Sequence, residues 1–474
     1  MHRHRVLLYN PNAVFYTMPL GLLAVGSALN AETYAVEIVD ARLEPAPLKM
    51  MIERANGALC VGITVITGRP IKDALRVSRA LKARYPQLPI VWGGWHPSLF
   101  QLECLEEESV DITIAGQGEV TFATVVKRLA AKETLEDIGG IAYRHQGTIT
   151  VNAPRSLQKV ESLPEHNYDL IPVNRYFELK NHRQLDYISS QGCRFRCEFC
   201  ADPFVYKRDW VGLPPERVGR EIAGLVATYN VREIAFQDET FFTSQKRVSG
   251  IAEAFSTADL DISWTATMRA DQGARLDDSV FDSVRKSGLR WVMIGVESGS
   301  QDMLDSIKKD IKIEQIFSSA EKCIRHDIGA IFPFIVGFPG ETDEGIAATL
   351  NLVKQLRKMS PRFEAQIFFY RPYPGSPIAM QAESDGYRMP TTIEEWADFD
   401  YVAADGSDNP WMSVPQRRMI QRFRFYQRHA FGIHPDRMHQ PLQWLARMRC
   451  RADFYQLPLE MSLVEWLRPN PQLS

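Results

Sequence analysis

The stretch that decides the fold is Gln191-Gly192-Cys193-Arg194-Phe195-Arg196-Cys197-Glu198-Phe199-Cys200, directly after the apolar run from Leu185 to Ser190. Cysteines separated by three and then two residues, on a loop that leaves a strand, can point at one centre as soft ligands for zinc or an iron–sulfur cluster. The nearest other cysteines, Cys104 and Cys323, are too distant in sequence to complete this loop. A four-iron cubane here would leave one iron without a cysteine ligand, as open catalytic metal sites do.

The alternative to a cluster is a zinc site completed by a histidine, for which His182 is the nearest candidate. A zinc ribbon normally has a second pair of ligands at a fixed distance. The residues after Cys200 instead alternate between strand and helix patterns. The cysteine loop therefore favours a cluster.

The cysteine spacing resembles the signature of the radical S-adenosylmethionine (radical SAM) superfamily. The resemblance implies that Cys193, Cys197 and Cys200 are the metal ligands and the catalytic centre, and that SAM chelates the open iron through its amino and carboxylate groups. It also implies that an external one-electron reductant, a flavodoxin or a ferredoxin, drives cleavage of SAM to methionine and a 5′-deoxyadenosyl radical. Phe199, between two ligands, is expected to shield the cluster from water.

Length and composition fit a globular protein of two or three domains, since a domain usually has about 100–200 residues. The chain has 474 residues, a net charge of −3 and seven cysteines, so it lacks the basic character of nucleic-acid binding proteins. An odd number of cysteines, three of them closely spaced, suits a reducing cytosol better than a disulfide framework. No signal peptide or membrane span is recognisable, which predicts a soluble, cytoplasmic protein.

Residues 5 to about 150 predict alternating strands and helices, and therefore a doubly wound, Rossmann-like parallel sheet. The expected strands are 5–10, 36–40, 58–66, 90–93 and 111–115, and the expected helices are 20–30, 71–85, 99–107 and 120–131. Such sheets bind ligands at the carboxyl ends of their strands. Glycines stand at those ends: Gly93 and Gly94 after the fourth strand, and Gly116 and Gly118, followed by Glu119, after the fifth.

This amino-terminal pattern is similar to the cobalamin-binding domain that precedes many radical SAM cores. The resemblance implies that Gly93, Gly94, Gly116, Gly118 and Glu119 border cobalamin. Many such domains carry Asp-x-His-x-x-Gly, but here Asp40 is followed by Ala41, Arg42, Leu43 and Glu44, so we expect no histidine ligand to cobalt from that loop. His96 is expected to act as a turn residue. The alternative is a flavodoxin-like domain without a cofactor.

Residues 135 to 185 are expected to connect two domains. The segments 138–143 and 148–151 predict a small hairpin, and residues 154–176, with three prolines, predict an extended linker. Family members share a proline-rich connector of this kind, in which a residue or two closes over the cofactor.

From Leu185 the alternation resumes with six strand–helix units. The expected strands are 185–190, 233–237, 262–268, 291–296, 331–337 and 365–370, and the helices are 215–229, 245–257, 277–286, 301–325 with an interruption, and 343–359. Six units are too few for a closed eight-stranded barrel. They match the laterally open partial (β/α)6 barrel of radical SAM enzymes.

Candidate cofactor-binding residues follow these strands. The resemblance implies that Asp238 and Glu239 jointly hold the amino group of SAM, that Glu297 bonds the ribose, and that the turn containing Gly337 and Pro339 passes under the adenine. A guanidinium fork is well shaped for a carboxylate, so Arg269 is expected to pair with that of SAM.

Residues 415 to 451 combine nine arginines with one acid, Asp436, and with the aromatic residues Phe423, Phe425, Tyr426, Phe431 and Trp444. One interpretation is a surface for anionic groups or a peripheral membrane contact. The favoured interpretation is an exposed basic helix whose aromatic residues cap the open barrel. No nucleic-acid partner is expected.

The sequence thus predicts an α/β fold with a cobalamin-binding domain at 1–145, a linker at 146–184, a radical SAM partial barrel at 185–380 and a mainly helical region at 381–474. The expected enzyme is a cobalamin-dependent radical SAM C-methyltransferase with three cofactors: a [4Fe–4S] cluster, SAM and cobalamin. Its expected substrate is a large, mostly apolar small molecule, such as a tetrapyrrole (a bacteriochlorophyll precursor, for example), a terpenoid or a polyketide. The alternatives are a cyclase of the anaerobic magnesium-protoporphyrin ester type and an inactive, cofactor-poor binding protein.

Overall fold

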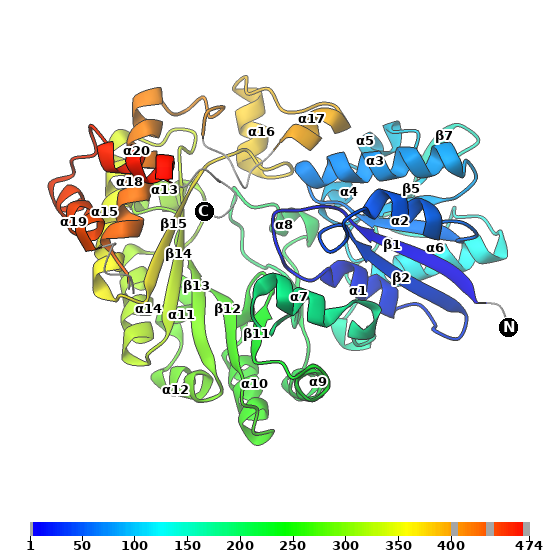
Figure 1. Cartoon of the computed structure of the whole chain (residues 1–474), viewed down its shortest axis with the longest axis horizontal. Coiled ribbons are helices and arrows are strands. Elements are labelled where there is room, and N and C mark those ends of the chain that lie inside the picture. Colours follow the sequence, from blue (N-terminus) through cyan, green and yellow to red (C-terminus); the bar gives the residue numbers. More distant parts are fainter. Residues whose placement is uncertain (1–2, 400–405, 433–439, 468–474) are drawn as a thin grey trace.

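The amino-terminal half is built on a seven-stranded sheet in the order β2-β1-β3-β4-β5-β6-β7 (Figure 1). The computed structural model describes residues 3–399, 406–432 and 440–467. Five strands run parallel and the last two pair antiparallel. The strands are β1 (His4–Asn10), β2 (Tyr34–Asp40), β3 (Cys60–Thr64), β4 (Ile90–Gly93), β5 (Ile112–Ile114), β6 (Ile141–His145) and β7 (Thr148–Val151).

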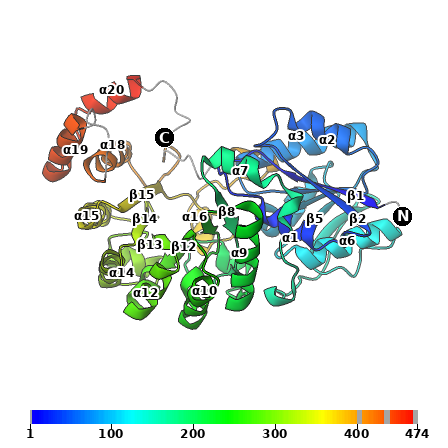
Figure 2. The ribbon, with the colours of Figure 1, turned by 60° about the horizontal axis from the view of Figure 1, so that its bottom comes forward.

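Helices cover both faces of this sheet, as predicted for a doubly wound fold. Figure 2 places α1 (Leu20–Ser27) and α6 (Glu119–Ala131) on one face, and α2 (Pro47–Arg54) and α3 (Arg69–Arg84) on the other. Helix α2 was not predicted, because this short helix buries only one apolar side chain, that of Met51. The predicted helix 99–107 is two helices, α4 (Trp95–Leu99) and α5 (Gln101–Glu106).

The connector differs from the predicted linker at both of its ends. Strand β7 lies within 146–184 but extends the first sheet, because it pairs with β6. Residues 173–180 form helix α7 (Val173–Lys180), which buries Val173, Tyr176 and Phe177 at helical spacing. The prolines suggested an extended chain throughout, but Pro172 immediately precedes α7, a position at which proline does not disrupt a helix. Two short 3₁₀ turns, Val160–Ser162 and Tyr168–Leu170, precede the helix.

The second half contains a six-stranded, wholly parallel sheet in the order β15-β14-β13-β12-β11-β8. This confirms the open six-stranded barrel predicted from the sequence, and its helices lie outside the strands (Figures 1 and 2). The strands are β8 (Gln184–Tyr187), β11 (Glu233–Phe236), β12 (Ser263–Arg269), β13 (Leu289–Gly295), β14 (Gly329–Val336) and β15 (Phe363–Phe369). The helices are α9 (Pro215–Tyr229), α10 (Gln245–Thr257), α11 (Ala270–Arg275), α12 (Asp278–Lys286), α13 (Gln301–Ser306), α14 (Ile313–Arg325) and α15 (Asp343–Met359).

Small elements surround the cysteine loop at the carboxyl end of β8. Strand β9 (Ser190–Gly192) leads into the loop and pairs antiparallel with β10 (Trp210–Gly212). Helix α8 (Asp202–Val205) follows Cys200 and lies between the barrel and the first domain in Figure 1. The cysteine loop is therefore placed where the two halves of the molecule meet.

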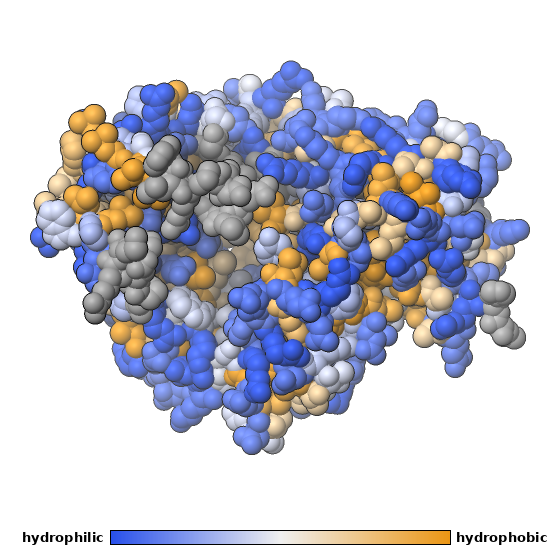
Figure 3. Space-filling model, viewed as in Figure 1, coloured by the Kyte–Doolittle hydropathy of each residue, from blue (hydrophilic) through white to orange (hydrophobic). Residues whose placement is uncertain are grey.

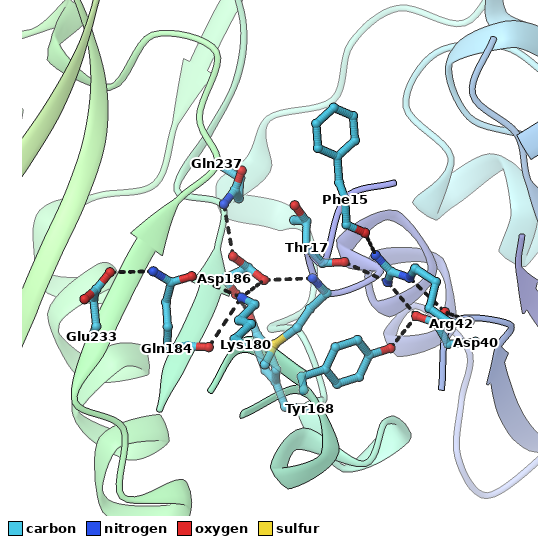
Figure 4. Close-up of polar contacts among 12 residues, drawn as sticks. Phe15, Thr17, Asp40, Arg42, Tyr168, Lys180, Gln184, Asp186, Glu233 and Gln237 are labelled. Carbon is cyan, nitrogen blue, oxygen red and sulfur yellow. Dashed lines mark hydrogen bonds and ion pairs between the residues drawn. The ribbon is translucent and has the colours of Figure 1, made fainter. Parts of the chain in front are cut away.

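Polar contacts hold the first domain against the barrel (Figure 4). Asp186 on β8 accepts hydrogen bonds from the backbone N–H of Met18 at 2.7 Å and from Gln237 at 3.0 Å, and it forms an ion pair with Lys180 of α7. Arg42 binds Asp40 and donates to the carbonyl oxygens of Phe15 and Thr17. The loop from β1 to α1 is thus held by both halves of the chain.

The carboxyl-terminal region is divided between the two halves. Helices α16 (Pro377–Ser384) and α17 (Ile393–Asp398) return to the first domain, where α17 packs on α3. Helix α18 (Val414–Ala430) contacts β15 and packs on α19 (Gln440–Ala452), and α20 (Leu459–Leu467) follows. Residues 381–474 are therefore not a single region at the barrel, because α17 finds its apolar partners on α3 and at Phe100.

The aromatic residues of α18 point mainly into the protein rather than toward a lipid face. Phe423 and Tyr426 are buried, and both pack on Tyr455. Trp444 on α19 is exposed, and Figure 3 shows apolar side chains over these helices among many polar ones. Asp436 lies outside the described residues. Among the described helices, none is long and apolar enough to span a membrane.

Replacement of Trp396 by alanine is expected to destabilise the first domain by about 3–5 kcal/mol, the usual cost of removing a buried aromatic side chain. Trp396 is 2% exposed, and its ring centroid lies 4.7 Å from that of Phe100. Urea unfolding followed by circular dichroism measures the effect. Trp444→Ala, which removes a side chain that is 60% exposed, is the matched control and should change stability by about 0.5 kcal/mol or less. Equal losses in the two variants would contradict this assignment.

Candidate functional site

The three predicted cluster ligands lie on one loop that the barrel fixes at several points. Cys193 and Cys197 are buried, and Cys200 is half-buried. Arg194 donates to the carbonyl oxygen of Thr243 at 3.2 Å, and Arg196 forms a two-point ion pair with Asp310. These contacts are made by the residues between the cysteines and not by the thiol groups. Among the residues that the structure describes, no three cysteine, histidine or acidic side chains are grouped so that they could hold a metal ion. Ligation of a cluster by Cys193, Cys197 and Cys200 therefore stays a prediction from their spacing.

The acids after β11 have separate partners, which corrects their joint assignment. Asp238 accepts hydrogen bonds from the backbone and hydroxyl of Ser189, at 2.8 and 2.6 Å, and from the hydroxyl of Ser190. Glu239 instead accepts from the backbone N–H of Gly192, directly before Cys193, and from the hydroxyl of Tyr206, both at 3.2 Å. Adjacent residues at a strand end point in opposite directions. Only Glu239 is therefore directed at the cysteine loop.

Burial raises the pKa of Glu239 from 4.5 to about 8. The native protein consequently holds this proton more tightly than the unfolded chain does. The stability linked to it is complete below about pH 4.5 and is lost as the pH rises through 8.

Glu239→Gln is expected to remove this pH dependence. In melting experiments on the ligand-free protein, the melting temperature of the wild type should fall more between about pH 6 and pH 9 than that of the variant. The other groups that titrate in this range are the same in both proteins. The difference between the two melting temperatures at each pH therefore reports the contribution of Glu239. Parallel melting curves across the range would show that Glu239 is ionised throughout.

A cavity of about 210 Å³ lies at the carboxyl edge of the first sheet and is shared with the barrel. All five residues predicted from the first domain, Gly93, Gly94, Gly116, Gly118 and Glu119, border it. Leu8, Leu20, Leu22, Val25, Ile63 and Phe122 form its apolar wall, and Ile188, Gln191, Val205 and Tyr206 reach it from the barrel. We call this space the shared cavity.

Gly116 suits close approach of a ligand, whereas Gly94 is required by close packing against the chain. No atom lies within 4 Å of the position that a Cβ of Gly116 would take, so its backbone faces open space. Gly94 has a φ of +96°, and its Cβ would lie 2.9 Å from Thr64 Oγ1. An apolar interior with a few polar groups at its rim is typical of an organic cofactor site. The residues present therefore fit cobalamin.

Comparisons with known proteins agree with both halves of this site. A family model for the B12 binding domain matches residues 7–126, and one for the radical SAM superfamily matches residues 187–353. An uncharacterized methyltransferase of Pyrococcus horikoshii is 31% identical over 366 residues, which cover 76% of this chain and 77% of that protein. The chain belongs to the cobalamin-binding radical SAM family. Its cofactors are accordingly a [4Fe–4S] cluster, SAM and cobalamin.

Other relatives of this radical SAM protein differ in their named reactions. An anaerobic magnesium-protoporphyrin IX monomethyl ester cyclase of Synechocystis is 25% identical and matches 72% of this chain and 68% of its own length. In fold, the chain is similar to the radical SAM methyltransferase TsrM of Kitasatospora setae, with a TM-score of 0.69 at 16% identity over 83% of this chain and 81% of that one. The chain is also similar in fold to the cobalamin-dependent S-adenosylmethionine radical enzyme OxsB. The TM-score is 0.74 at 16% identity, and the match covers 96% of this chain and 76% of that chain.

Arg269, predicted to bind the carboxylate of SAM, is directed at the cysteine loop. Its guanidinium lies 3.8 Å from the centroid of the Phe195 ring, and Nη1 is 3.5 Å from Cys197 Sγ. The other nitrogens donate to Asp271 and to the carbonyl oxygen of Lys309. These three contacts use only part of the five N–H donors of the guanidinium, so the contact of Arg269 with the carboxylate of SAM stays a prediction. A buried cation beside a ligand sulfur offsets the negative charge of bound thiolates.

Glu297, predicted to bond the ribose, lies next to the cluster loop. Its φ is +69°, and its carboxylate forms a buried ion pair with Lys309 at 2.7 Å. The ammonium of Lys309 is 5.8 Å from the centroid of Phe199, whose ring also packs on Phe338. Shielding of the cluster by Phe199 stays a prediction. The strained backbone of Glu297 marks a residue held in place by its surroundings.

The turn predicted to pass under the adenine is fixed by two side chains. Glu341 accepts hydrogen bonds from the N–H groups of Gly337 and Phe338, and burial raises its pKa to about 7. Asn409 donates to the carbonyl oxygen of Gly337 at 2.9 Å. Gly337 has a φ of +85°, which favours glycine, and Pro339 follows in the same turn. Asn409 belongs to no motif, so sequence reasoning could not have found it.

Neither His96, expected to be a turn residue, nor His182, the candidate of the zinc alternative, lies in the shared cavity or beside the cysteines. His96 is fully buried against Phe100 and Trp396, bonds Thr67 at 3.1 Å and is absent from the lining of the shared cavity. Burial lowers its pKa to about 3, so the ring is neutral. His182, the candidate for the zinc alternative, pairs with Glu233 at the start of β11, whereas the cysteines follow the other end of β8.

The connector supplies residues to the shared cavity that the sequence could not assign. His166 borders the cavity, and the backbone N–H of Gln158 donates to Gln117 at 2.8 Å. Arg42, on the loop that lacks the histidine motif, binds Asp40 and is not among the cavity-lining residues. Only the proline-rich composition indicated that residues of this connector would reach the cofactor.

Proposed function

We propose that this enzyme methylates an unactivated carbon of a large, mostly apolar small molecule. Membership of a family with methyltransferases among its relatives supports a transferase of the cobalamin-dependent radical SAM type. The observation that carries the proposal is the position of Gln191 and Tyr206. They border the shared cavity at either side of the cysteine loop, which supports neighbouring positions for the proposed cobalamin and SAM sites.

The side chains of the chain have distinct roles in this proposal. When bound, the cofactors supply a strong reductant, a hydrogen-abstracting radical and a methyl group. Cys193, Cys197 and Cys200 hold the cluster, Glu239 accepts from the amino group of SAM, and Glu297 bonds its ribose. Gly337 and Pro339 position the adenine. The glycines of the shared cavity and Glu119 hold cobalamin, and the apolar walls exclude water.

The apolar substrate class is supported by a second cavity, of about 390 Å³, beside the loop from β1 to α1. Val14 and Phe15 of that loop and Ile66 after β3 border it and are 54%, 50% and 38% exposed. The backbone of the loop is fixed by Arg42, so these side chains can face a ligand without disorder of the chain. Adjacent exposed apolar residues beside a cavity are typical of a binding site. Arg69, Lys72, Asp73 and Arg76 line the cavity as well. This combination suits a tetrapyrrole, terpenoid or polyketide that carries charged groups on a large apolar body.

A radical SAM cyclase that transfers no methyl group is the second candidate. The relatives from Synechocystis and Rubrivivax gelatinosus, both named as anaerobic magnesium-protoporphyrin IX monomethyl ester cyclases, favour it. The two reactions share the abstraction of hydrogen and differ in the fate of the methyl group.

The test uses anaerobically reconstituted, cobalamin-loaded enzyme with an external reductant such as reduced flavodoxin. S-adenosylhomocysteine and 5′-deoxyadenosine are measured after incubation with extracts that contain candidate substrates. Methyl transfer predicts comparable amounts of both products, stimulated by one extract. Deoxyadenosine alone would support the cyclase, and a protein that retained neither iron nor cobalt would support an inactive binding protein.

A further inference from the structure

Gln191, at the start of the cysteine loop, is hydrogen bonded to two residues of the first domain that border the shared cavity. The side-chain oxygen of Gln191 accepts from Gln117 at 2.7 Å, and its nitrogen donates to Glu119 at 3.3 Å. Gln117 lies between Gly116 and Gly118 at the edge of the shared cavity, and its own oxygen accepts from the backbone of Gln158. Any shift of Gln117 is therefore transmitted to the residue two positions before Cys193.

Tyr206, which follows the cysteine loop in the chain, also contacts both the first domain and the barrel. Tyr206, directly after α8, donates to Glu239, and its ring lies 5.9 Å from that of Trp95 in the first domain. Glu239 in turn accepts from Gly192. At Gly192, where φ is +91°, a Cβ would lie 2.3 Å from the carbonyl oxygen of Asp209, so only glycine fits between Glu239 and Asp209. Contacts to the first domain thus hold the cluster loop from both ends.

We propose that Gln191 and Tyr206 are positioning residues that couple the two cofactor sites, so that cobalamin in the shared cavity strengthens the binding of SAM. The inference rests on the proposed roles of the shared cavity and of Glu239. Both side chains border the cavity, and both are linked to the Gly192–Glu239 bond beside the SAM site. A ligand that orders Gln117, Gln191 and Tyr206 fixes Glu239 before SAM arrives. The second ligand then orders fewer groups and binds more tightly.

Thermodynamic linkage makes the effect reciprocal. If cobalamin raises the affinity for SAM about fivefold, at the low end of usual couplings, SAM raises the affinity for cobalamin by the same factor. Either measurement can be made on the oxidised protein without reductant, where no turnover occurs. The coupling is therefore separable from catalytic activity.

The experiment measures the Kd of SAM by calorimetry on cluster-reconstituted protein, with and without saturating hydroxocobalamin. The wild type should bind SAM about fivefold more tightly when loaded. Gln191→Leu and Gln117→Leu should each bring the ratio of the two Kd values close to one. Because both act on the same bond, the double variant should change the ratio no further. Tyr206→Phe, which keeps the ring and loses the bond to Glu239, should lower the ratio as well.

Gln245→Leu is the matched control, since Gln245 is exposed at the start of α10 and bonds only Asp277. It should retain the wild-type ratio. Equal Kd values for loaded and empty wild-type protein would overturn the inference and leave the proposed function intact. The inference would also be overturned if Gln191→Leu and Gln117→Leu changed the ratio of the Kd values additively, or if neither variant changed it. Failure of the wild type to bind cobalamin or SAM would overturn the proposed function too.

Discussion

Cys197→Ala is expected to abolish the cluster and, with it, the cleavage of SAM. Cys197 is buried in the loop between Arg196 and Glu198, and Arg269 lies 3.5 Å from its sulfur. The alanine variant leaves two thiolates where the open cluster needs three. Iron content and the visible absorption of the cluster should fall to background, and the formation of 5′-deoxyadenosine should fall at least about 10³-fold.

Cys450→Ala controls for the loss of a buried thiol as such. Cys450 is buried in α19, remote in the fold from the cluster loop. Its replacement should leave iron content and 5′-deoxyadenosine formation at the wild-type level. A Cys197→Ala protein that kept a full complement of iron and cleaved SAM would show that another group completes the site.

Gly94→Ala is expected to weaken cobalamin binding at least about tenfold. A side chain at a φ of +96° strains the folded protein by about 1–3 kcal/mol. If the loop moves to relieve this strain, cobalamin must restore its position on binding, and a cost of about 1.4 kcal/mol corresponds to a factor of ten in affinity. The new Cβ would also lie 3.1 Å from the backbone N and O of Val65, which cannot rotate away as a side chain can. Relief of this contact must move the loop that borders the shared cavity. The ratio of cobalt to protein after gel filtration measures the loss.

Gly57→Ala has the same backbone strain without the contact. Its φ is +73°, no atom lies within 4 Å of the new Cβ, and the residue does not border the shared cavity. This variant should lose some stability and retain cobalamin. If Gly94→Ala bound cobalamin as tightly as Gly57→Ala does, the edge of β4 would not form the cofactor site.

The sequence predicted those parts of the fold that local patterns encode. The buried strands of the barrel and helices such as α9, α10 and α15 were placed to within a few residues, because apolar periodicity and helix caps are properties of short segments. The four glycines and Glu119 at the edge of the first sheet were predicted to border a ligand for a similar reason. Topology places the carboxyl ends of parallel strands at one edge, and all five line the shared cavity.

Contacts that depend on the direction of a side chain were not predictable. Asp238 and Glu239 are adjacent in sequence, and only the fold determines that one binds Ser189 while the other binds Gly192. Arg269 stacks on Phe195, a contact between residues 74 positions apart in sequence that no local pattern indicates. The return of α17 to the first domain is equally non-local, because Trp396 finds its partners about 300 residues earlier in the chain.

The measurement that tests the central claim most directly is the mass of the product formed from methyl-deuterated SAM. Loaded enzyme, reductant and the extract that stimulates SAM consumption are incubated together, and the new product is compared with that from unlabelled SAM. Methylation of a substrate carbon predicts a product that carries the complete deuterated methyl group, formed together with unlabelled S-adenosylhomocysteine. A new product without deuterium, accompanied by 5′-deoxyadenosine alone, would contradict methyl transfer.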